Sequence, residues 1–158
     1  MNQSAIFKET FSYTTINIYY LLYKNLPENT IAEKIIKIRK IRNLERDEFA
    51  NVINHNLSTV QHWEVKNVPP TPGSILDICN IFNLELNYFS EYYYLYYNPP
   101  IEKIIKWKTK KGYTYKQCCD ILDINYSTFS RLINDRVSLS YSMYIKLINN
   151  KIIKYTLN

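Results

Sequence analysis

Glu33-Lys34-Ile35-Ile36-Lys37 recurs letter for letter as Glu102-Lys103-Ile104-Ile105-Lys106, which sets an offset of 69 residues (33 to 102) between two copies. The same offset, without a gap, relates further pairs of positions: Asn56 and Asn125, Ser58 and Ser127, Thr59 and Thr128, Val52 and Ile121, Ile53 and Leu122, Val60 and Phe129, Trp63 and Leu132. A self-match at a fixed spacing indicates one structural unit used twice. The sequence therefore predicts two similar small domains.

Two further positions of the repeat predict a sharp turn between two helices. Asn54 and Asp123 are equivalent, and Asn and Asp are the residues that best tolerate left-handed backbone after glycine. Four residues earlier stand Ala50 and Cys119, whose side chains are small enough for two helices to cross closely. Both features are typical of a helix-turn-helix, and the sequence predicts that motif in each copy.

The first copy resembles the Cro/XRE family of phage-repressor helix-turn-helix proteins. The resemblance covers residues 31–86 and is carried by Phe49-Ala50-Asn51-Val52-Ile53, Ser58-Thr59-Val60-Gln61-His62-Trp63-Glu64, Pro69-Pro70 and Ile75-Leu76. These fit the family's pattern "LA..L....ST...WE....P...L". It implies a lambda-repressor-like helical domain that binds DNA.

The second copy is similar to the same family but degenerate. Its third helix is expected over Tyr126–Asn134 (YSTFSRLIN), where Ile133 stands in place of Glu64. The stretch Ser130–Asp135 also resembles antitoxin-type members of the family, in which an autoregulator pairs with a toxin.

The apolar spacing i, i+3/i+4 predicts an all-α fold. Helices are expected over Thr14–Asn25, Ile31–Arg42, Arg46–Ile53, Leu57–Lys66, Ser74–Phe82, Ile101–Lys111, Tyr115–Leu122, Tyr126–Asn134 and Tyr141–Asn149, with a short helical end in Lys151–Asn158. The predicted domains are an N-terminal arm with a short helix (1–29), a first domain (30–87), an aromatic connector helix (88–98) and a second domain (99–158). We expect the apolar stripe at Ile18, Leu21 and Leu22 to pack on the first domain, and the connector to join the two domains or two chains.

Composition excludes several classes of function. The chain has 158 residues and only two glycines, which excludes a P-loop and a dinucleotide-binding fingerprint. No apolar run reaches the roughly 20 residues that cross a bilayer, and no secretory leader is apparent, so we expect a cytoplasmic protein with no membrane partner. The cysteines and histidines do not stand at metal-ligand spacing: Cys79, Cys118, Cys119, His55 and His62. We expect buried, reduced cysteines, no metal and no cofactor.

Charge is unevenly distributed along the chain. Residues 1–98 hold 9 Lys/Arg against 10 Asp/Glu, a net charge of −1, whereas residues 99–158 hold 11 against 4, a net charge of +7. The two parts sum to the total of +6. A basic half of this kind either binds a polyanion or presents a solvated face.

The resemblance implies that the third helix of each copy lies in the major groove of DNA. The base-contacting residues would be Leu57, Ser58, Gln61 and His62 in the first copy and Tyr126, Ser127, Ser130 and Arg131 in the second. Gln61 suits adenine, Arg131 suits guanine and Leu57 suits a thymine methyl group; for Leu57 and Tyr126, packing between domains is the alternative. The sugar-phosphate backbone would be contacted by Arg39, Arg46, Asn56, Lys66, Lys108, Lys116, Asn125 and Arg136.

The leading prediction is a sequence-specific DNA-binding transcriptional regulator, most simply a repressor, with double-stranded DNA as partner. Either both copies read DNA, or one copy serves dimerisation or a protein partner. The alternative is an interaction protein that uses the same fold, such as an antitoxin or a phage anti-defence protein. An enzyme is not expected, because no catalytic constellation stands at motif spacing.

Overall fold

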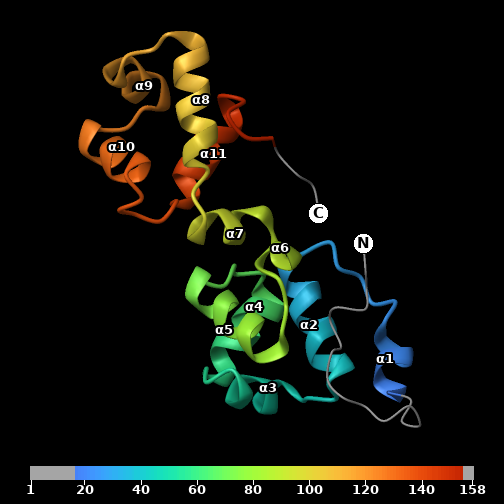
Figure 1. Cartoon of the computed structure of the whole chain (residues 1–158). Helices are drawn as coiled ribbons and strands as arrows, with labels where there is room; N and C mark the ends of the chain where they lie inside the picture. The colour runs from blue at the N-terminus through green and yellow to red at the C-terminus, as the bar shows by residue number, and fades with distance from the viewer. Residues whose placement is uncertain (1–16, 155–158) are drawn as a thin grey trace. The chain divides into compact units, whose positions relative to one another are not determined.

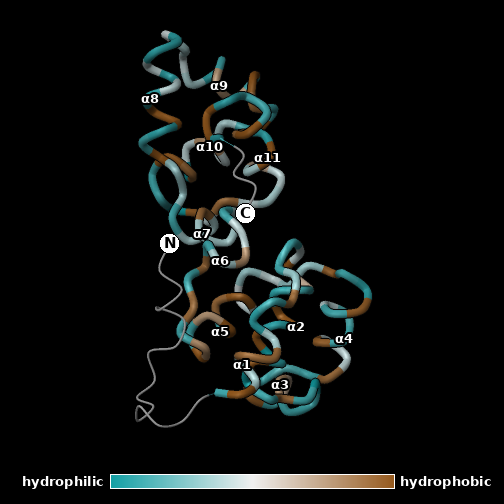
Figure 2. Tube along the Cα trace, turned by 90° about the vertical axis from the view of Figure 1, so that its right-hand side faces the viewer, coloured by the Kyte–Doolittle hydropathy of each residue, from teal (hydrophilic) through white to brown (hydrophobic). Residues whose placement is uncertain are grey.

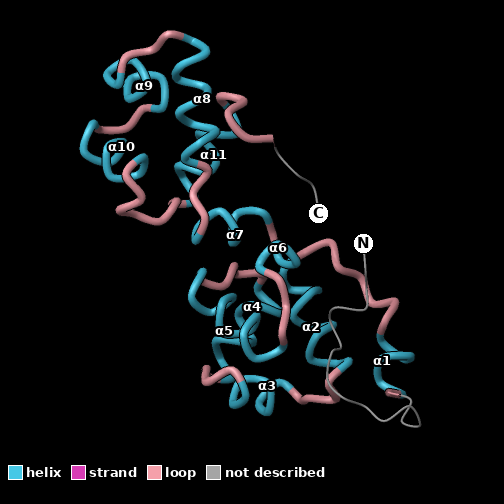
Figure 3. The backbone as a smooth tube through the Cα atoms, in the orientation of Figure 1, coloured by secondary structure: helices cyan, strands magenta, loops and turns pink. Residues whose placement is uncertain are grey.

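The computed structural model describes residues 17–154, and within that range the chain is entirely helical (Figure 3). Eleven helices and no strand are present among these residues. This confirms the predicted all-α class. The expected N-terminal arm and the last four residues of the tail lie outside the described range.

The chain divides into two compact units, Met1–Ser90 and Glu91–Asn158, each with its own hydrophobic core. Figure 2 shows that apolar and polar stretches alternate along the helices of both units, as expected where each helix buries one face. We describe each unit by itself.

Unit 1 holds six helices (Figure 1): α1 (Ile18–Tyr23), α2 (Ile31–Ile41), α3 (Arg46–Val52), α4 (Leu57–Lys66), α5 (Pro72–Phe82) and α6 (Leu86–Phe89). Helix α4 packs against both α2 and α3. The centre of the core is completely buried: Ile35, Phe49, Val60, Ile75 and Ile78 are all 0% exposed. The α2 N-terminus is fixed by a reciprocal capping box between Thr30 and Glu33, which satisfies otherwise unpaired backbone donors.

Unit 2 holds five helices: α7 (Glu91–Tyr97), α8 (Ile101–Lys111), α9 (Tyr115–Leu122), α10 (Tyr126–Ile133) and α11 (Tyr141–Asn149). Helix α10 packs against α8 and α9, and α11 packs against α9. The innermost residues come from four of the five helices and one loop: Ile104, Cys118, Leu122, Phe129, Leu132, Leu139 and Leu147.

The 69-residue repeat is a structural repeat as well. Pairs of residues that it relates occupy equally buried positions: Ile35 and Ile104, Phe49 and Cys118, Ala50 and Cys119, Ile53 and Leu122, Val60 and Phe129, Trp63 and Leu132. The turns match too. Asn43 and Gly112 have φ of 55° and 68°, and Asn54 and Asp123 have φ of 55° and 48°. The predicted left-handed residues at the second turn are therefore confirmed, and the small residues Ala50 and Cys119 are buried as expected.

Three predicted elements differ in the structure. The stretch 88–98 is not one helix: Ser90 has extended backbone (φ −168°, ψ 159°) and separates α6 in unit 1 from α7 in unit 2. Helix α5 begins at Pro72, two residues before its predicted start at Ser74, since a proline at the first helical position loses no hydrogen bond. Residues 151–153 form turns in place of the predicted helical end.

The apolar stripe of α1 is also not packed as predicted. Ile18, Leu21 and Leu22 are 59%, 49% and 64% exposed, although α1 lies against α2. The sequence of this stripe resembles a segment that is buried elsewhere in the chain. Tyr19-Tyr20-Leu21-Leu22-Tyr23 is similar to Tyr93-Tyr94-Leu95-Tyr96-Tyr97 of α7. In unit 2 that motif does enter the core, where Tyr93 and Leu95 are 2% and 5% exposed.

Candidate nucleic-acid interface

Helices α4 and α10 occupy equivalent places, each directly after a left-handed turn and each with one face in a core. Val60 and Trp63 form the buried face of α4, and Phe129 and Leu132 form that of α10. In both turns the residue directly after the left-handed one bonds back to the preceding helix: His55 N–H donates to the Ala50 carbonyl at 2.8 Å and Ile124 N–H to the Cys119 carbonyl at 3.0 Å. These bonds fix the direction in which each third helix leaves the turn.

The predicted base-contacting residues lie on the outer faces of these two helices. Seven of the eight are exposed (Leu57, Ser58, Gln61, His62, Tyr126, Ser127 and Arg131), and Ser130 is half-buried. Leu57 and Tyr126, which begin the two helices, are 43% and 60% exposed. Large apolar groups at that position are therefore not consumed by packing within their own units.

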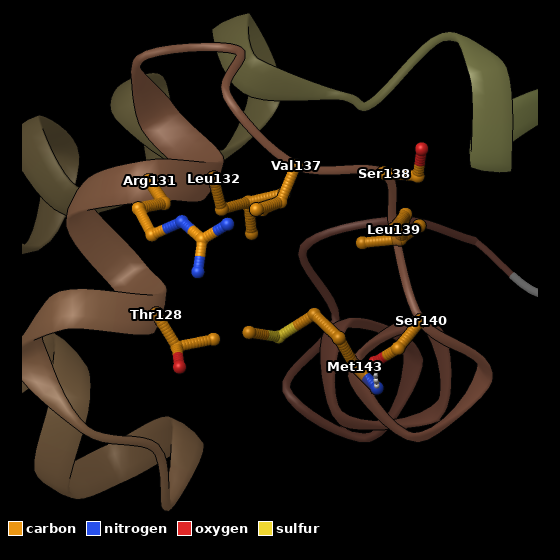
Figure 4. Close-up of a pocket in the computed structure, with 8 residues that line it drawn as sticks. All are labelled: Thr128, Arg131, Leu132, Val137, Ser138, Leu139, Ser140 and Met143. Carbon is orange, nitrogen blue, oxygen red and sulfur yellow. Dashed lines mark hydrogen bonds between the residues drawn. The ribbon is translucent and has the colours of Figure 1, made fainter.

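The two faces differ in how free their polar groups are. On α4, His62 Nε2 lies 2.9 Å from Lys66 Nζ, so these two predicted DNA contacts are hydrogen-bonded to each other. On α10, Arg131 lies beside a surface hollow whose walls include Thr128, Ser138 and Met143 (Figure 4). No ion pair or hydrogen bond engages its guanidinium among the described residues, so this cation is available to an outside acceptor.

Arg39 is buried in an ion-pair network, whereas the predicted DNA-backbone contact would need its guanidinium at the surface. Its side chain is only 5% exposed and makes two bonds to Glu64, from Nε to Oε1 at 2.8 Å and from an outer nitrogen to Oε2 at 3.1 Å. It also donates to the Leu44 carbonyl at 3.0 Å. The amphipathic pattern of α2 placed Arg39 among solvent-facing cations, because a hydropathy pattern cannot recognise a buried charge whose partner lies on another helix.

Arg46 belongs to the same network. Its Nε donates to Glu64 Oε2 at 2.8 Å, and its side chain is 35% exposed against 0% for Glu64. One buried carboxylate therefore holds two arginines from two helices, as buried charges require. In unit 2 the equivalent of Glu64 is the apolar Ile133, so this network has no counterpart there.

The two equivalent asparagines before α4 and α10 are not used alike. Asn125 Oδ1 accepts a hydrogen bond from the Thr128 N–H at 2.7 Å and so caps α10. Asn56 stands at the equivalent position before α4 but makes no such bond. Because the cap engages the Asn125 carbonyl oxygen, only its amide group is left to meet a phosphate.

The remaining predicted backbone contacts lie mostly on unit 2. Lys116 and Arg136 are exposed and make no ion pair among the described residues, whereas Lys108 Nζ lies 4.8 Å from the centre of the Tyr115 ring. Lys111, which the prediction did not include, is also exposed, in the last turn of α8 just before the start of α9. The run Lys108-Thr109-Lys110-Lys111 was the available signal.

Charge separates the two units sharply. Unit 1 has nine Lys/Arg and nine Asp/Glu, and unit 2 has eleven against five, so the whole net charge of +6 belongs to unit 2. In unit 1 many cations are neutralised internally: Lys37 with Glu28 at 3.3 Å, Lys40 with Glu45 at 3.5 Å, and the two arginines with Glu64. In unit 2, Lys146 pairs with Asp123 at 3.0 Å.

His55 corresponds to Ile124 in the repeat, and the structure places it at the edge of the core. Its ring meets the Trp63 ring edge-on at 5.2 Å, and Nε2 lies 3.8 Å from Asp77 Oδ2. The side chain is 24% exposed. It therefore packs as a core-edge residue, the role that Ile124 fills in unit 2.

Three other features bear on the kind of site. Cys79, Cys118 and Cys119 are free and buried as predicted, and burial raises the pKa of each thiol. Within residues 17–154 no group of three or more His, Cys, Asp or Glu side chains is placed to hold a metal ion. Over the same range, every helix is too short or too polar to traverse a lipid bilayer.

Comparison with known proteins adds no relative. No protein-family model, no curated protein and no solved structure matches this chain.

Proposed function

We propose that this chain is a sequence-specific DNA-binding regulator of transcription, built from two helix-turn-helix units of the Cro/XRE type. The observation that carries the proposal is the outer face of α10, where Tyr126, Ser127 and Arg131 are exposed on the unit that holds the entire net charge. A third helix of this kind is sized to enter the major groove with its N-terminal side chains against base edges.

The proposed mechanism divides positioning from reading. Lys111, Lys116 and Arg136 are exposed around α9 and α10, and such cations bind phosphates without regard to sequence. Arg131 then suits the O6 and N7 acceptors of guanine, and Tyr126 offers an apolar ring to a thymine methyl group. Unit 1 offers Leu57 in the place of Tyr126 and Gln61 in the place of Ser130, but its neutral charge weakens its binding to phosphates.

The first test measures binding of the full chain to a duplex selected from a random DNA library, by fluorescence polarisation at several salt concentrations. We expect affinity to fall steeply with salt, and Lys116→Gln to lower the slope of log K against log salt by about 0.9. Lys24→Gln, which changes an exposed lysine of unit 1, is the matched control and should leave the slope unchanged. Affinity that does not respond to salt would contradict phosphate binding.

The second test asks which unit reads bases. Arg131→Ala should weaken binding to the selected site by about 5- to 150-fold, the range of one good bidentate contact, and relax the preference at one base pair. Gln61→Ala should have the same kind of effect only if unit 1 also reads bases. If Arg131→Ala leaves both affinity and preference unchanged, α10 is not a recognition helix.

A second candidate function is supported by the internal neutralisation of unit 1. A unit whose lysines and arginines are paired with its own carboxylates is suited to contacts with protein more than with phosphate. On this view unit 1 serves dimerisation or a protein partner, as in the interaction-protein alternative. Binding to DNA that survives changes throughout α4 but fails with Arg131→Ala would favour it.

A further inference from the structure

The identical pentapeptides at the start of the repeat have opposite surroundings. In unit 1, Lys34 is 6% exposed; its Nζ donates to the carbonyls of Tyr88 at 2.7 Å and Phe89 at 3.2 Å. These carbonyls end helix α6, and the Tyr88 ring lies 5.5 Å from the same Nζ. An ammonium group therefore holds the C-terminal end of an aromatic helix.

The second lysine of the pentapeptide completes this arrangement with a carboxylate. Lys37 Nζ lies 3.3 Å from Glu28 Oε2, and the Tyr88 hydroxyl donates to Glu28 Oε1 at 2.7 Å. Burial lowers the pKa of Lys34, partly offset by the nearby Glu28 charge. This face of α2 is thus covered by a helix end and a glutamate that match its two lysines.

In unit 2 the same face is bare. Lys103 and Lys106, the equivalents of Lys34 and Lys37, are exposed and have no hydrogen bond or ion pair among the residues described. Ile105 between them is 46% exposed, whereas its equivalent Ile36 is half-buried. Lys110 extends the positive charge along the helix. Among residues 17–154, no helix end or glutamate covers the side chains that match the covered face of unit 1.

This bare face is not the one that meets DNA in the proposed function. Ile104 forms the buried face of α8, and α10 packs against α8. At roughly 100° per residue, Lys106, Lys110 and Lys103 lie about 200° to 260° around the helix from Ile104. They therefore point away from α10, and a duplex in contact with α10 is not placed to reach them.

We propose that the outer face of α8, formed by Lys103, Ile105, Lys106 and Lys110, docks a protein partner through the C-terminal end of an acidic, aromatic-containing helix. The chemistry of the occupant is taken from unit 1, where the identical pentapeptide holds the end of an aromatic helix through Lys34 and a separate carboxylate, Glu28, through Lys37. Charge complementarity supports the same choice, since three unpaired lysines repel a basic partner and attract an acidic one. The proposal does not depend on DNA binding by α10.

The test uses a capped peptide of residues 83–91 (NLELNYFSE), which reproduces α6 and carries two glutamates, added to the full chain. Binding is followed by protection of individual lysines from amine acetylation, read by mass spectrometry. Lys34 is the internal reference, because its buried amine should react slowly with or without peptide. We expect the peptide to protect Lys103 and Lys106 in a saturable way, and a peptide with Glu85→Gln and Tyr88→Ala to protect them far less.

Matched double variants decide whether the face itself is responsible. Lys103→Gln with Lys106→Gln should weaken peptide binding at least about fivefold, the scale of one lost charge-assisted contact, while Lys151→Gln with Lys154→Gln removes the same charge elsewhere and should not. Equal binding by both variants, or no protection at millimolar peptide, would overturn the proposal. A DNA duplex that protects Lys103 and Lys106 as strongly as Lys116 would also overturn it, by assigning the face to phosphate.

Discussion

At the scale of single residues, Glu64 is the most consequential side chain of unit 1. Its carboxylate is 0% exposed and receives hydrogen bonds from Arg39 and Arg46. The sequence pattern that includes Trp63-Glu64 could not show that Glu64 holds Arg39 in the interior of the unit. A buried ion pair contributes little compared with an apolar replacement, but breaking one leaves an uncompensated charge.

Glu64→Gln should therefore destabilise the chain by about 3 kcal/mol, since the buried Arg39 loses its counter-charge. The matched control is Glu45→Gln, which removes a carboxylate 3.9 Å from the same arginine but 75% exposed and should cost less than about 0.5 kcal/mol. Urea unfolding followed by circular dichroism measures both. Equal effects would mean that Glu64 is not the charge on which Arg39 depends.

At the scale of elements, most helices of the repeat begin at a capping side chain or end at a left-handed residue. The structure places most predicted helices within two residues of their expected ends, because the capping Thr and Ser residues, Pro72 and the left-handed Asn and Asp residues act locally. Ser90 carries no comparable signal, since an extended serine inside an aromatic run looks like any helical position. Packing in the two units, not local preference, divides that run.

Helix α10 should depend on its cap more than α4 does. Asn125→Ala removes the 2.7 Å bond to the Thr128 N–H and should cost about 1 kcal/mol. Asn56→Ala at the equivalent position removes no side-chain cap and should cost distinctly less. Thermal and urea unfolding of the two variants give the comparison, and a larger loss for Asn56→Ala would contradict the capping assignment.

At the scale of the whole molecule, the 69-residue repeat in the sequence predicts two units, and equivalent burial at six pairs of positions agrees with it. The candidate interface was predictable to the same depth, since the exposed faces of α4 and α10 follow from the repeat. The division of charge between the units was visible too. What the sequence did not reveal is which cations are already neutralised, because Glu28, Glu45 and Glu64 meet theirs through tertiary contacts.

Each core contains a buried group, a thiol or a phenol, whose pKa is raised by burial. The stability of the folded chain should therefore fall at alkaline pH. Desolvation, aided by Glu85, raises the pKa of Cys79 from 9.0 to about 12, and desolvation raises the pKa of the Tyr93 hydroxyl in unit 2. A folded-state pKa above the unfolded one gives stability that is complete below the unfolded pKa and is lost as pH rises through the folded one.

We therefore expect the free energy of unfolding to stay level up to about pH 9 and to fall between about pH 9 and pH 12 as the unfolded state loses its protons first. Urea titrations across this range measure it. Cys79→Ala should flatten part of the decline, because it removes one of the contributing groups. A stability that rises over the same range would show that these buried groups ionise more easily in the folded chain.

The left-handed turns have a consequence for the chain before it folds. Six of the seven non-glycine residues with positive φ are Asn or Asp, and Gly112 is the one glycine among the described residues in that conformation. An Asn or Asp residue is slightly strained in the native turn. In the unfolded chain, however, it samples fewer backbone conformations than glycine would. Each turn therefore loses less conformational entropy on folding than a glycine turn would. This favours the folded state of a protein whose two hydrophobic cores are both small.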